Sequence, residues 1–456
     1  MTPVLITGGL ISLLMAWLAW QFPIDAAVSI GPISVKVTET MSVFGRGFSL
    51  TDAQRPFLAF LFISSACWYF GAIIAYPGEF FGPATMAILS LLIAAVAVEP
   101  FLYAALLIEL AVLICIPLLA PPWKLAGRGV FRFLSFQTFG MPFILFTGWM
   151  LTGVSASPSN VGMVVTASIF LGLGFAFLLG VFPFHSWIPM ITEQSHPYAA
   201  GLLLYFFPGI ISIFALGFLD RYVWLREDPS VFLMIQWVGT IMVFFGGLWA
   251  AFQTHLGKIF GFAAMMEIGL TLVSIGLGTP DGLDLYFAMW VPRLVVYIIW
   301  AISLATISRE NDGDLSYNRA AGFGLASPYI LLTLMISNLS LVGAPALAGY
   351  PLRIALWQST ASISQLRALI LLLGAGGLLV AVFRTISVML SYPENTMKSK
   401  MLEFKEHLAL DHDRENLPEL LFFVFSMIVL LLIGWFPQWW YSFLAAFPGM
   451  FELLGM

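Results

Sequence analysis

Long apolar runs recur from one end of the chain to the other, and this pattern limits the possible folds more than any other feature. About thirteen of them, within a range of about twelve to fourteen, reach the roughly 20 residues that a helix needs to cross a bilayer. Of all residues, 60% are hydrophobic and 9% charged, against about 25% charged in soluble domains. The sequence therefore predicts an all-α, multi-pass membrane protein. The runs lie at about 2–21, 55–76, 80–97, 99–120, 131–153, 161–182, 198–219, 230–251, 255–277, 282–306, 327–347, 364–391 and 417–437.

The two ends of the chain are expected on opposite sides of the membrane. Run 2–21 follows no basic segment and precedes no small-residue cleavage site, so we expect a retained helix rather than a signal peptide. With thirteen spans, Lys and Arg are more frequent in the loops that hold Lys124 and Lys258 than in the loops that hold Arg221 and Arg353. This bias predicts a cytoplasmic N-terminus and an outer C-terminus.

Two interruptions of the apolar pattern suggest how the spans are organised. Pro and Gly directly adjoin apolar runs at 181–198 and 342–353, and backbone left unpaired at membrane depth is tolerated only in a cavity or inside protein. Paired interruptions are typical of transporters with inverted repeats and discontinuous helices. The alternative is that each interruption is an ordinary loop end.

We accordingly divide the chain into four parts. The N-terminal part includes an expected hairpin outside the membrane at about 28–50, because Ser34, Lys36 and Thr38 alternate with apolar residues. Two inverted repeats follow, and the last part holds a polar loop, the last span and an interfacial segment. The four parts are 1–98, 99–220, 221–391 and 392–456.

Five ionisable residues in or beside the apolar runs are the candidate proton-path residues. A charge near the centre of a spanning helix costs about 2.5–3.5 kcal/mol, so each needs a reason. Glu109 is interpreted as a proton-exchanging carboxyl or as a neutral, hydrogen-bonded one. Glu267 and Arg293 form either a proton relay or an ion pair that holds the bundle together. His185 either passes protons or braces the broken backbone, and Lys258 is either part of the path or an interfacial anchor.

Several segments resemble one membrane-protein family. The run Pro183-Phe184-His185-Ser186-Trp187-Ile188-Pro189 is similar to the PFHxWLPD signature of the antiporter-like subunits of respiratory complex I, membrane-bound hydrogenases and Mrp cation/proton antiporters. Segments 255–269, 289–297, 312–328 and 340–350 resemble further family motifs in the family's order. The resemblance covers about 50–440 and places Glu109, Glu267, Arg293 and Lys258 at ionisable positions of the family.

The departures from this family fall on its chemistry. Leu178 stands where the family has a lysine, five residues before the proline of the signature. A second family lysine would fall near Pro208 or Gly209, and run 198–219 contains no Lys, Arg, His, Asp or Glu. The sequence therefore predicts poor proton conduction, or a path rerouted through Glu267, Arg293 and water.

The resemblance implies a membrane subunit of a complex I-like energy-converting assembly in the cell (cytoplasmic or inner) membrane. Its expected partners are homologous antiporter-like subunits and hydrophilic redox subunits, and no nucleic acid. We expect no cofactor and no metal, and no autonomous oxidoreductase activity, although the assembly would be a translocating NADH:quinone oxidoreductase or a hydrogenase-type complex. The alternatives are a non-conducting structural paralogue within such an assembly and a stand-alone secondary transporter.

Overall fold

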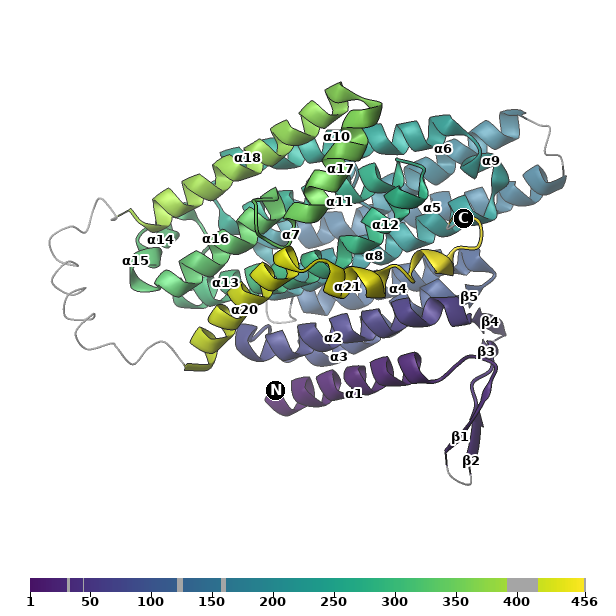
Figure 1. The fold of residues 1–456 in the computed structure, drawn as a ribbon, viewed down its shortest axis with the longest axis horizontal. Helices are drawn as coiled ribbons and strands as arrows, with labels where there is room; N and C mark the ends of the chain where they lie inside the picture. Colours follow the sequence, from purple (N-terminus) through teal and green to yellow (C-terminus); the bar gives the residue numbers. More distant parts are fainter. Residues whose placement is uncertain (31–32, 44, 121–125, 157–160, 392–416, 455–456) are drawn as a thin grey trace, which may run out of the picture.

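The computed structural model describes residues 1–30, 33–43, 45–120, 126–156, 161–391 and 417–454, and it confirms the all-α membrane fold (Figure 1). Within these residues, nine helices are long and apolar enough to cross a membrane, or up to eleven if each of two bent pairs is one span. Two shorter apolar helices, Phe81–Ala97 and Gly162–Leu178, occupy the two remaining runs. Each of the thirteen apolar runs is therefore helical.

The helices of the runs lie roughly parallel along the long axis of the molecule (Figure 1). Run 282–306 contains two helices, because α12 ends at Ala288 and α13 begins at Trp290. The helices are α1 (Thr2–Gln21), α2 (Arg55–Ala75), α3 (Phe81–Ala97), α4 (Ala104–Leu119), α5 (Arg128–Ala156), α6 (Val161–Leu178), α8 (Pro197–Arg221), α10 (Pro229–Phe252), α11 (Leu256–Ile275), α12 (Pro280–Ala288), α13 (Trp290–Glu310), α16 (Pro328–Val342), α18 (Gln365–Met389) and α20 (Leu417–Trp435).

The segment expected to hold one hairpin contains two. Strands β1 (Ala27–Ile30) and β2 (Ile33–Lys36) pair antiparallel, as do β3 (Thr40–Val43) and β4 (Arg46–Ser49). The two-residue strand β5 (Val98–Glu99), which follows α3, adds to β4. Both hairpins lie at the same end of the helix bundle (Figure 1).

Helical structure is interrupted at both places where Pro and Gly break the apolar pattern. After α6 ends at Leu178, the chain forms a 3-10 turn at Phe184–Ser186 and the short helix α7 (Trp187–Gln194). After α16 ends at Val342, the helix α17 (Tyr350–Ile363) begins seven residues beyond Gly343. The division into inverted repeats stays a prediction, and the polar loop 392–416 lies outside the described residues.

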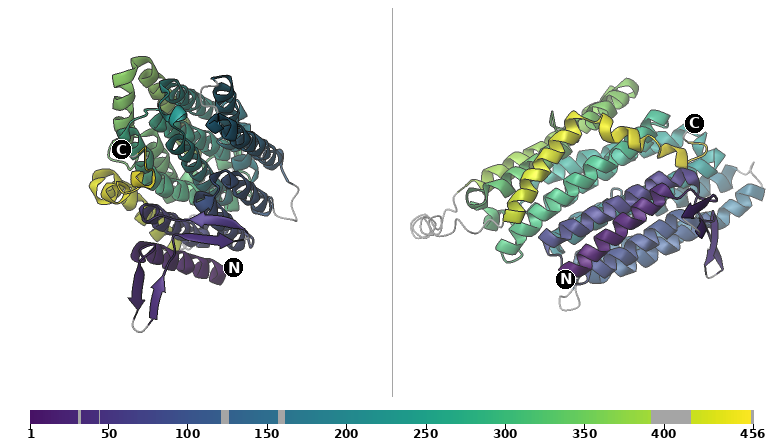
Figure 2. Two further views of the ribbon diagram at one scale, coloured as in Figure 1. Left: turned by 90° about the vertical axis from the view of Figure 1, so that its right-hand side faces the viewer. Right: turned by 60° about the horizontal axis from the view of Figure 1, so that its bottom comes forward.

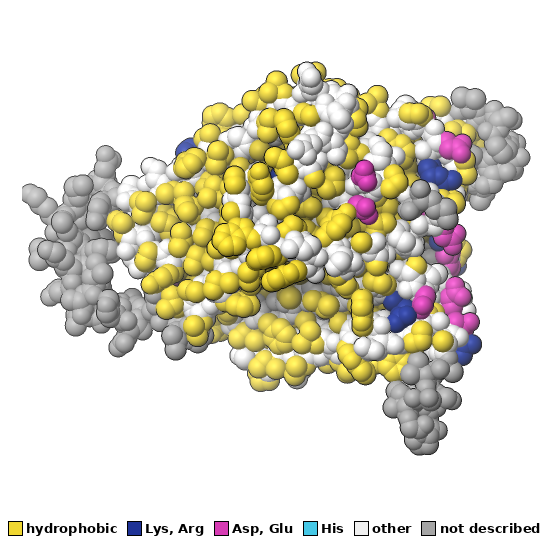
Figure 3. Space-filling model, viewed as in Figure 1, with side chains coloured by type: hydrophobic (Ala, Val, Ile, Leu, Met, Phe, Trp, Pro, Cys, Tyr) yellow, Lys and Arg dark blue, Asp and Glu magenta, His cyan; other side chains and the backbone are white. Residues whose placement is uncertain are grey.

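Helices α8 and α11 form the centre of the bundle. In each of them, 94% of an apolar stretch of 18 residues is buried, against 22% in α1. Helix α1 lies at the edge of the bundle beside α2 (Figure 2). Apolar side chains dominate the face in Figure 3, and acidic and basic side chains gather at the end that carries the strands. This distribution is the one expected for a protein that places its middle in hydrocarbon.

Candidate functional site

Glu267 and Arg293, two of the sequence candidates, meet in the buried centre of the molecule. Glu267 on α11 is 3% exposed and Arg293 on α13 is 6% exposed. The Arg293 Nε lies 3.3 Å from Glu267 Oε2, and an Nη donates to the Glu267 carbonyl at 3.2 Å. That Nη also donates to Thr271 Oγ1 at 2.8 Å. The arginine is thus held by a carboxylate, a carbonyl and a hydroxyl of one helix.

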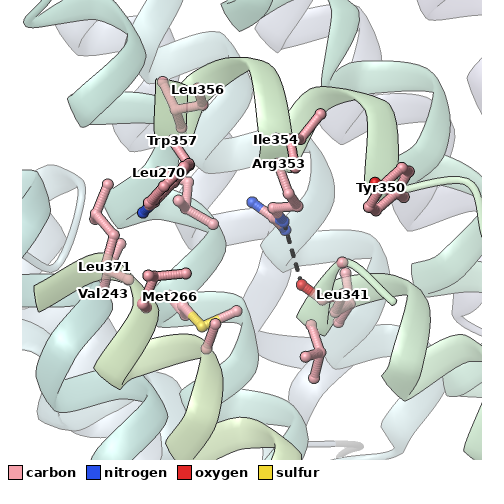
Figure 4. A pocket seen from close by; sticks show the side chains of 14 residues that line it. Val243, Met266, Leu270, Leu341, Tyr350, Arg353, Ile354, Leu356, Trp357 and Leu371 are labelled. Atoms are coloured by element: carbon pink, nitrogen blue, oxygen red, sulfur yellow. Dashed lines mark hydrogen bonds between the residues drawn. The ribbon is translucent and has the colours of Figure 1, made fainter. Parts of the chain in front are cut away.

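Arg353 completes this group, which we call the Glu267 cluster (Glu267, Arg293 and Arg353). An Nη of Arg353 donates to Glu267 Oε1, and its Nε donates to the Leu341 carbonyl at 3.2 Å (Figure 4). The sequence predicts a loop at Arg353, which is wrong, because Arg353 lies on α17 (Tyr350–Ile363). Its position directly after the Pro- and Gly-rich break at 342–353 was the available signal, because cavities at membrane depth form at such breaks.

The second break lets Arg353 approach Glu267. Gly343 has a φ of +90°, a left-handed conformation that favours glycine. A Cβ added to Gly343 would lie 2.7 Å from Arg353 Cγ. The turn after α16 is therefore fitted to the arginine side chain, and α17 carries that arginine to the carboxylate.

The Glu267 cluster lies beside a small space whose other walls are mostly apolar. Two guanidinium groups face one carboxylate among its members, and a cavity of about 20 Å³ adjoins all three residues and Ser340. A water needs about 10–15 Å³ of such space and two or more polar partners. The space is therefore large enough for one water next to the carboxylate.

Glu109 lies apart from this cluster and is half-buried rather than fully buried. It shares one face of α4 with Leu106, Leu110 and Leu113, which are exposed. Thr138 Oγ1 of α5 donates to Glu109 Oε1 at 2.6 Å. The run was apolar on all sides, so periodicity could not show which face of the helix lies outside.

His185 and Lys258 lie at two further places. The His185 ring stacks on Trp249 and Phe182, with centroid distances of 4.9 and 5.5 Å. Its Nδ1 has no hydrogen-bond partner among the described residues, so this nitrogen does not brace the backbone there. Lys258 Nζ lies 2.8 Å from Glu193 Oε1, with both side chains about one-third exposed.

The region around Leu178, which has no lysine, contains the side-chain amide of Gln137. Leu178 is buried, and Gln137 Nε2 of α5 donates to its carbonyl at 2.9 Å, where α6 ends. The Oε1 of Gln137 is buried and has no partner among the described residues. Gln137 therefore places a polar side chain beside Leu178, although an amide cannot carry a charge.

The description of the matching family model is "NADH:quinone oxidoreductase/Mrp antiporter, TM", and the match spans residues 151–380, about half of the chain. The chain belongs to this family. The matched part includes His185, Lys258 and all three members of the Glu267 cluster, but not Glu109.

Curated relatives match the chain over shorter lengths. The NADH-quinone oxidoreductase subunit N of Francisella tularensis subsp. holarctica is 26% identical over 185 residues, which are 39% of this chain and 36% of that protein. The NADH-ubiquinone oxidoreductase chain 2 of Marchantia polymorpha is 27% identical over 207 residues, 45% of this chain and 40% of that one. The chain therefore spans about two fifths of the length of the relatives it matches.

Solved structures match the fold over nearly the whole chain. A chain of Thermus thermophilus respiratory complex I has a TM-score of 0.70 at 19% identity, covering 100% of this chain and 95% of that one. A chain of the archaeal membrane-bound sulfane sulfur reductase has a TM-score of 0.73 at 15% identity, with 98% and 91% covered. A chain of the Mrp complex of a Dietzia species has a TM-score of 0.71 at 14% identity, with 100% and 93% covered. These likenesses show a shared fold.

Proposed function

We propose that this chain is a membrane subunit of a complex I-like energy-converting assembly, and that any proton it moves passes through the Glu267 cluster. The observation that carries this proposal is a buried carboxylate between two arginines from two other helices. Such a group at membrane depth is costly, and intramembrane ionisable groups mark ion pathways by default.

The family and the names of the relatives support the assembly. The relatives are subunits of NADH–quinone and NADH–ubiquinone oxidoreductases, and the structural matches are chains of multi-subunit complexes. The proposed partners are homologous antiporter-like membrane subunits and hydrophilic redox subunits. The proposed location is the cell (cytoplasmic or inner) membrane, and the electron transfer belongs to the partners.

Arg353 is the member of the cluster that lies beyond the second break of the apolar pattern. It lies on α17, which is joined to α16 through the non-helical residues 343–349. A shift of α17 would separate Arg353 from Glu267 while Arg293, held by Thr271 as well, stays in place. The carboxylate would then have one cation fewer beside it and would take up a proton more readily, since a nearby cation favours the charged form.

Proton flux driven by quinone reduction tests the proposal, measured with the intact complex in liposomes. We expect Glu267→Gln to lower the flux per electron by at least about tenfold, because proton-transfer groups of this kind contribute 10²–10⁴-fold. Glu99→Gln is the control, since Glu99 forms an exposed ion pair with Arg221 at 2.7 Å. Equal fluxes in the wild type and Glu267→Gln would refute the role of the cluster.

The same assay includes Glu109→Gln, because Glu109 is the competing candidate. A loss of flux in this variant alone would move the path to the α4–α5 surface. If both variants match the wild type, no path runs through either carboxylate.

A second candidate function is that of a structural paralogue that completes the assembly without moving ions. The observation in its favour is the first half of the bundle, where Leu178 is buried against α5. The α8 residues Leu202–Phe214 are all buried and include no Lys, Arg, His, Asp or Glu. Normal quinone reduction with no flux attributable to this subunit would support it. Stable activity of the chain purified alone would instead support the stand-alone transporter.

A further inference from the structure

Arg367 is a buried cation outside the Glu267 cluster. It lies in the first turn of α18, is 5% exposed, and has no hydrogen-bond partner for Nε or Nη1 among the described residues. Its nearest aromatic contact is the Trp237 ring of α10, whose centroid lies 5.7 Å from Cζ. Burying an unpaired charge is strongly destabilising, so the guanidinium needs an anionic partner that the described chain does not supply.

An apolar cavity begins one helical turn from this arginine. It has a volume of about 280 Å³ and lies among α10, α11, α16, α17 and α18 (Figure 4). Leu371, one turn after Arg367, lines it together with Leu372, Trp357, Ile354 and Leu270. Trp357 Nε1 donates to the Ala368 carbonyl at 3.2 Å and so fixes α17 beside the start of α18.

Arg353 at the inner end of this cavity is already engaged. Its guanidinium donates to Glu267 and to the Leu341 carbonyl. The two arginines therefore differ: Arg353 has hydrogen-bond partners, whereas Nε and Nη1 of Arg367 have none within the part of the chain that the structure describes. Arg367 is not itself one of the residues that line the cavity; it lies one helical turn before Leu371, which does.

The direction of the groove matches that of a lipid in a bilayer. Arg367 lies at the start of a membrane-spanning helix, hence near the level of lipid headgroups. From Arg367 to Ala375, the last α18 residue of the cavity, the helix descends about 12 Å at 1.5 Å per residue. Leu366, Leu369, Leu372 and Leu373 of the same helix are exposed toward the lipid.

We infer that this groove binds an anionic glycerophospholipid, with its phosphate on the Arg367 guanidinium and one acyl chain in the cavity. A planar guanidinium can donate two parallel hydrogen bonds to a phosphate. The apolar walls accept the chain, and the exposed leucines leave the groove open to the bilayer. This inference does not depend on the proposed function.

Lipid retention by the purified full-length chain tests the site. The delipidated chain is mixed with phosphatidylglycerol or phosphatidylcholine, and the bound lipid is counted by native mass spectrometry. We expect one retained phosphatidylglycerol in preference to phosphatidylcholine, and about a tenfold loss of that preference in Arg367→Gln, as for a lost charge-assisted hydrogen bond. Arg384→Gln on the same helix is the matched control, because Arg384 donates to the Ala251 carbonyl and lies far from the cavity.

A second variant tests the acyl-chain half of the site and does not rely on Arg367→Gln folding normally. Ala375→Phe fills the inner end of the cavity, so it should reduce retention of both lipids while leaving the preference for phosphatidylglycerol. Equal retention by the wild type and Arg367→Gln, or an equal loss in Arg384→Gln, would overturn the inference.

Photo-cross-linking in native membranes separates a lipid from a protein occupant. With a benzoylphenylalanine at position 372, we expect adducts of lipid mass. Adducts with a neighbouring protein would mean that a partner subunit covers this face, and would also overturn the inference.

Discussion

At the scale of single residues, the effect of each arginine in the Glu267 cluster depends on the other. Glu267 accepts from Arg293 and from Arg353, so removing the carboxylate leaves two buried cations, whereas removing one arginine leaves a balanced pair. Arg293 also has Thr271 as an acceptor. The loss of Arg353 should therefore be tolerated better than the loss of Glu267.

A double-mutant cycle measures this dependence. We expect Glu267→Gln to lower the free energy of unfolding by about 3–5 kcal/mol, as for a broken buried pair. Arg353→Met should cost less, and the double variant should be more stable than the sum of the single effects by about 0.5–3 kcal/mol. Denaturant unfolding of the purified chain gives all three values. Strict additivity would show that the two residues do not interact.

The exposed ion pair between Arg221 and Glu99 provides the matched comparison. Both side chains are more than 40% exposed, and such pairs contribute about 0–1 kcal/mol. Glu99→Gln should therefore have little effect on unfolding. A cost as large as that of Glu267→Gln would show that burial is not what makes the cluster important.

The cluster was only partly predictable from the sequence. Glu267 and Arg293 stand out because charged residues within apolar runs are rare, and their runs are neighbours along the chain. Arg353 does not stand out, because it follows a break and looks like a loop residue until α17 folds back toward α11. The half-exposed position of Glu109 was unpredictable because α4 is apolar on every face.

At the scale of secondary-structure elements, α10 and α18 approach each other through glycines. A Cβ at Gly374 would lie 2.5 Å from the Val243 carbonyl oxygen, and one at Gly377 would lie 2.5 Å from the Gly247 carbonyl oxygen. Small residues let the backbones of two spanning helices come close, which increases their van der Waals contact. This contact also forms part of the wall behind the lipid groove, since Val243 lines it.

Alanine substitutions at neighbouring glycines of α18 should have opposite effects. Gly374→Ala is expected to destabilise the chain by about 1–3 kcal/mol, because the added methyl overpacks against α10. Gly376→Ala is the control: nothing lies within 4 Å of its added Cβ, and alanine favours the helix by up to about 1 kcal/mol. Thermal unfolding of the two variants in one detergent compares them. Equal shifts would contradict the close helix contact.

The elements were more predictable than their packing. Each apolar run became helical because its backbone can satisfy its own hydrogen bonds only as a helix in hydrocarbon. The ends of the helices were less predictable: α6 ends at Leu178, four residues before the expected end of its run, and run 282–306 is divided at Met289. Hydrophobicity sets the length of a run. It does not set the residue at which a helix ends inside the run, as the ends at Leu178 and Ala288 show.

At the scale of the whole molecule, the α4–α5 face carries a carboxylate, Glu109, among exposed apolar residues. Glu109 lies there at membrane depth. It accepts from Thr138 and forms no ion pair with the residues that the structure describes. Trp149 and Phe146 of α5 are exposed on the same helix that carries Thr138. A carboxylate facing lipid would cost about 2.5–3.5 kcal/mol, so we expect a neighbouring membrane subunit to cover it and to donate to it.

Photo-cross-linking from this face in native membranes identifies what covers it. A benzoylphenylalanine at position 110, beside Glu109, should form adducts with another membrane protein, and Glu109→Gln should lower their yield because the donor of the neighbour loses its charged acceptor. The control is position 369 on α18, where Leu369 is exposed and lipid adducts are expected. Lipid adducts alone at position 110 would mean that Glu109 faces the bilayer, and the subunit would then not use this face to join its assembly.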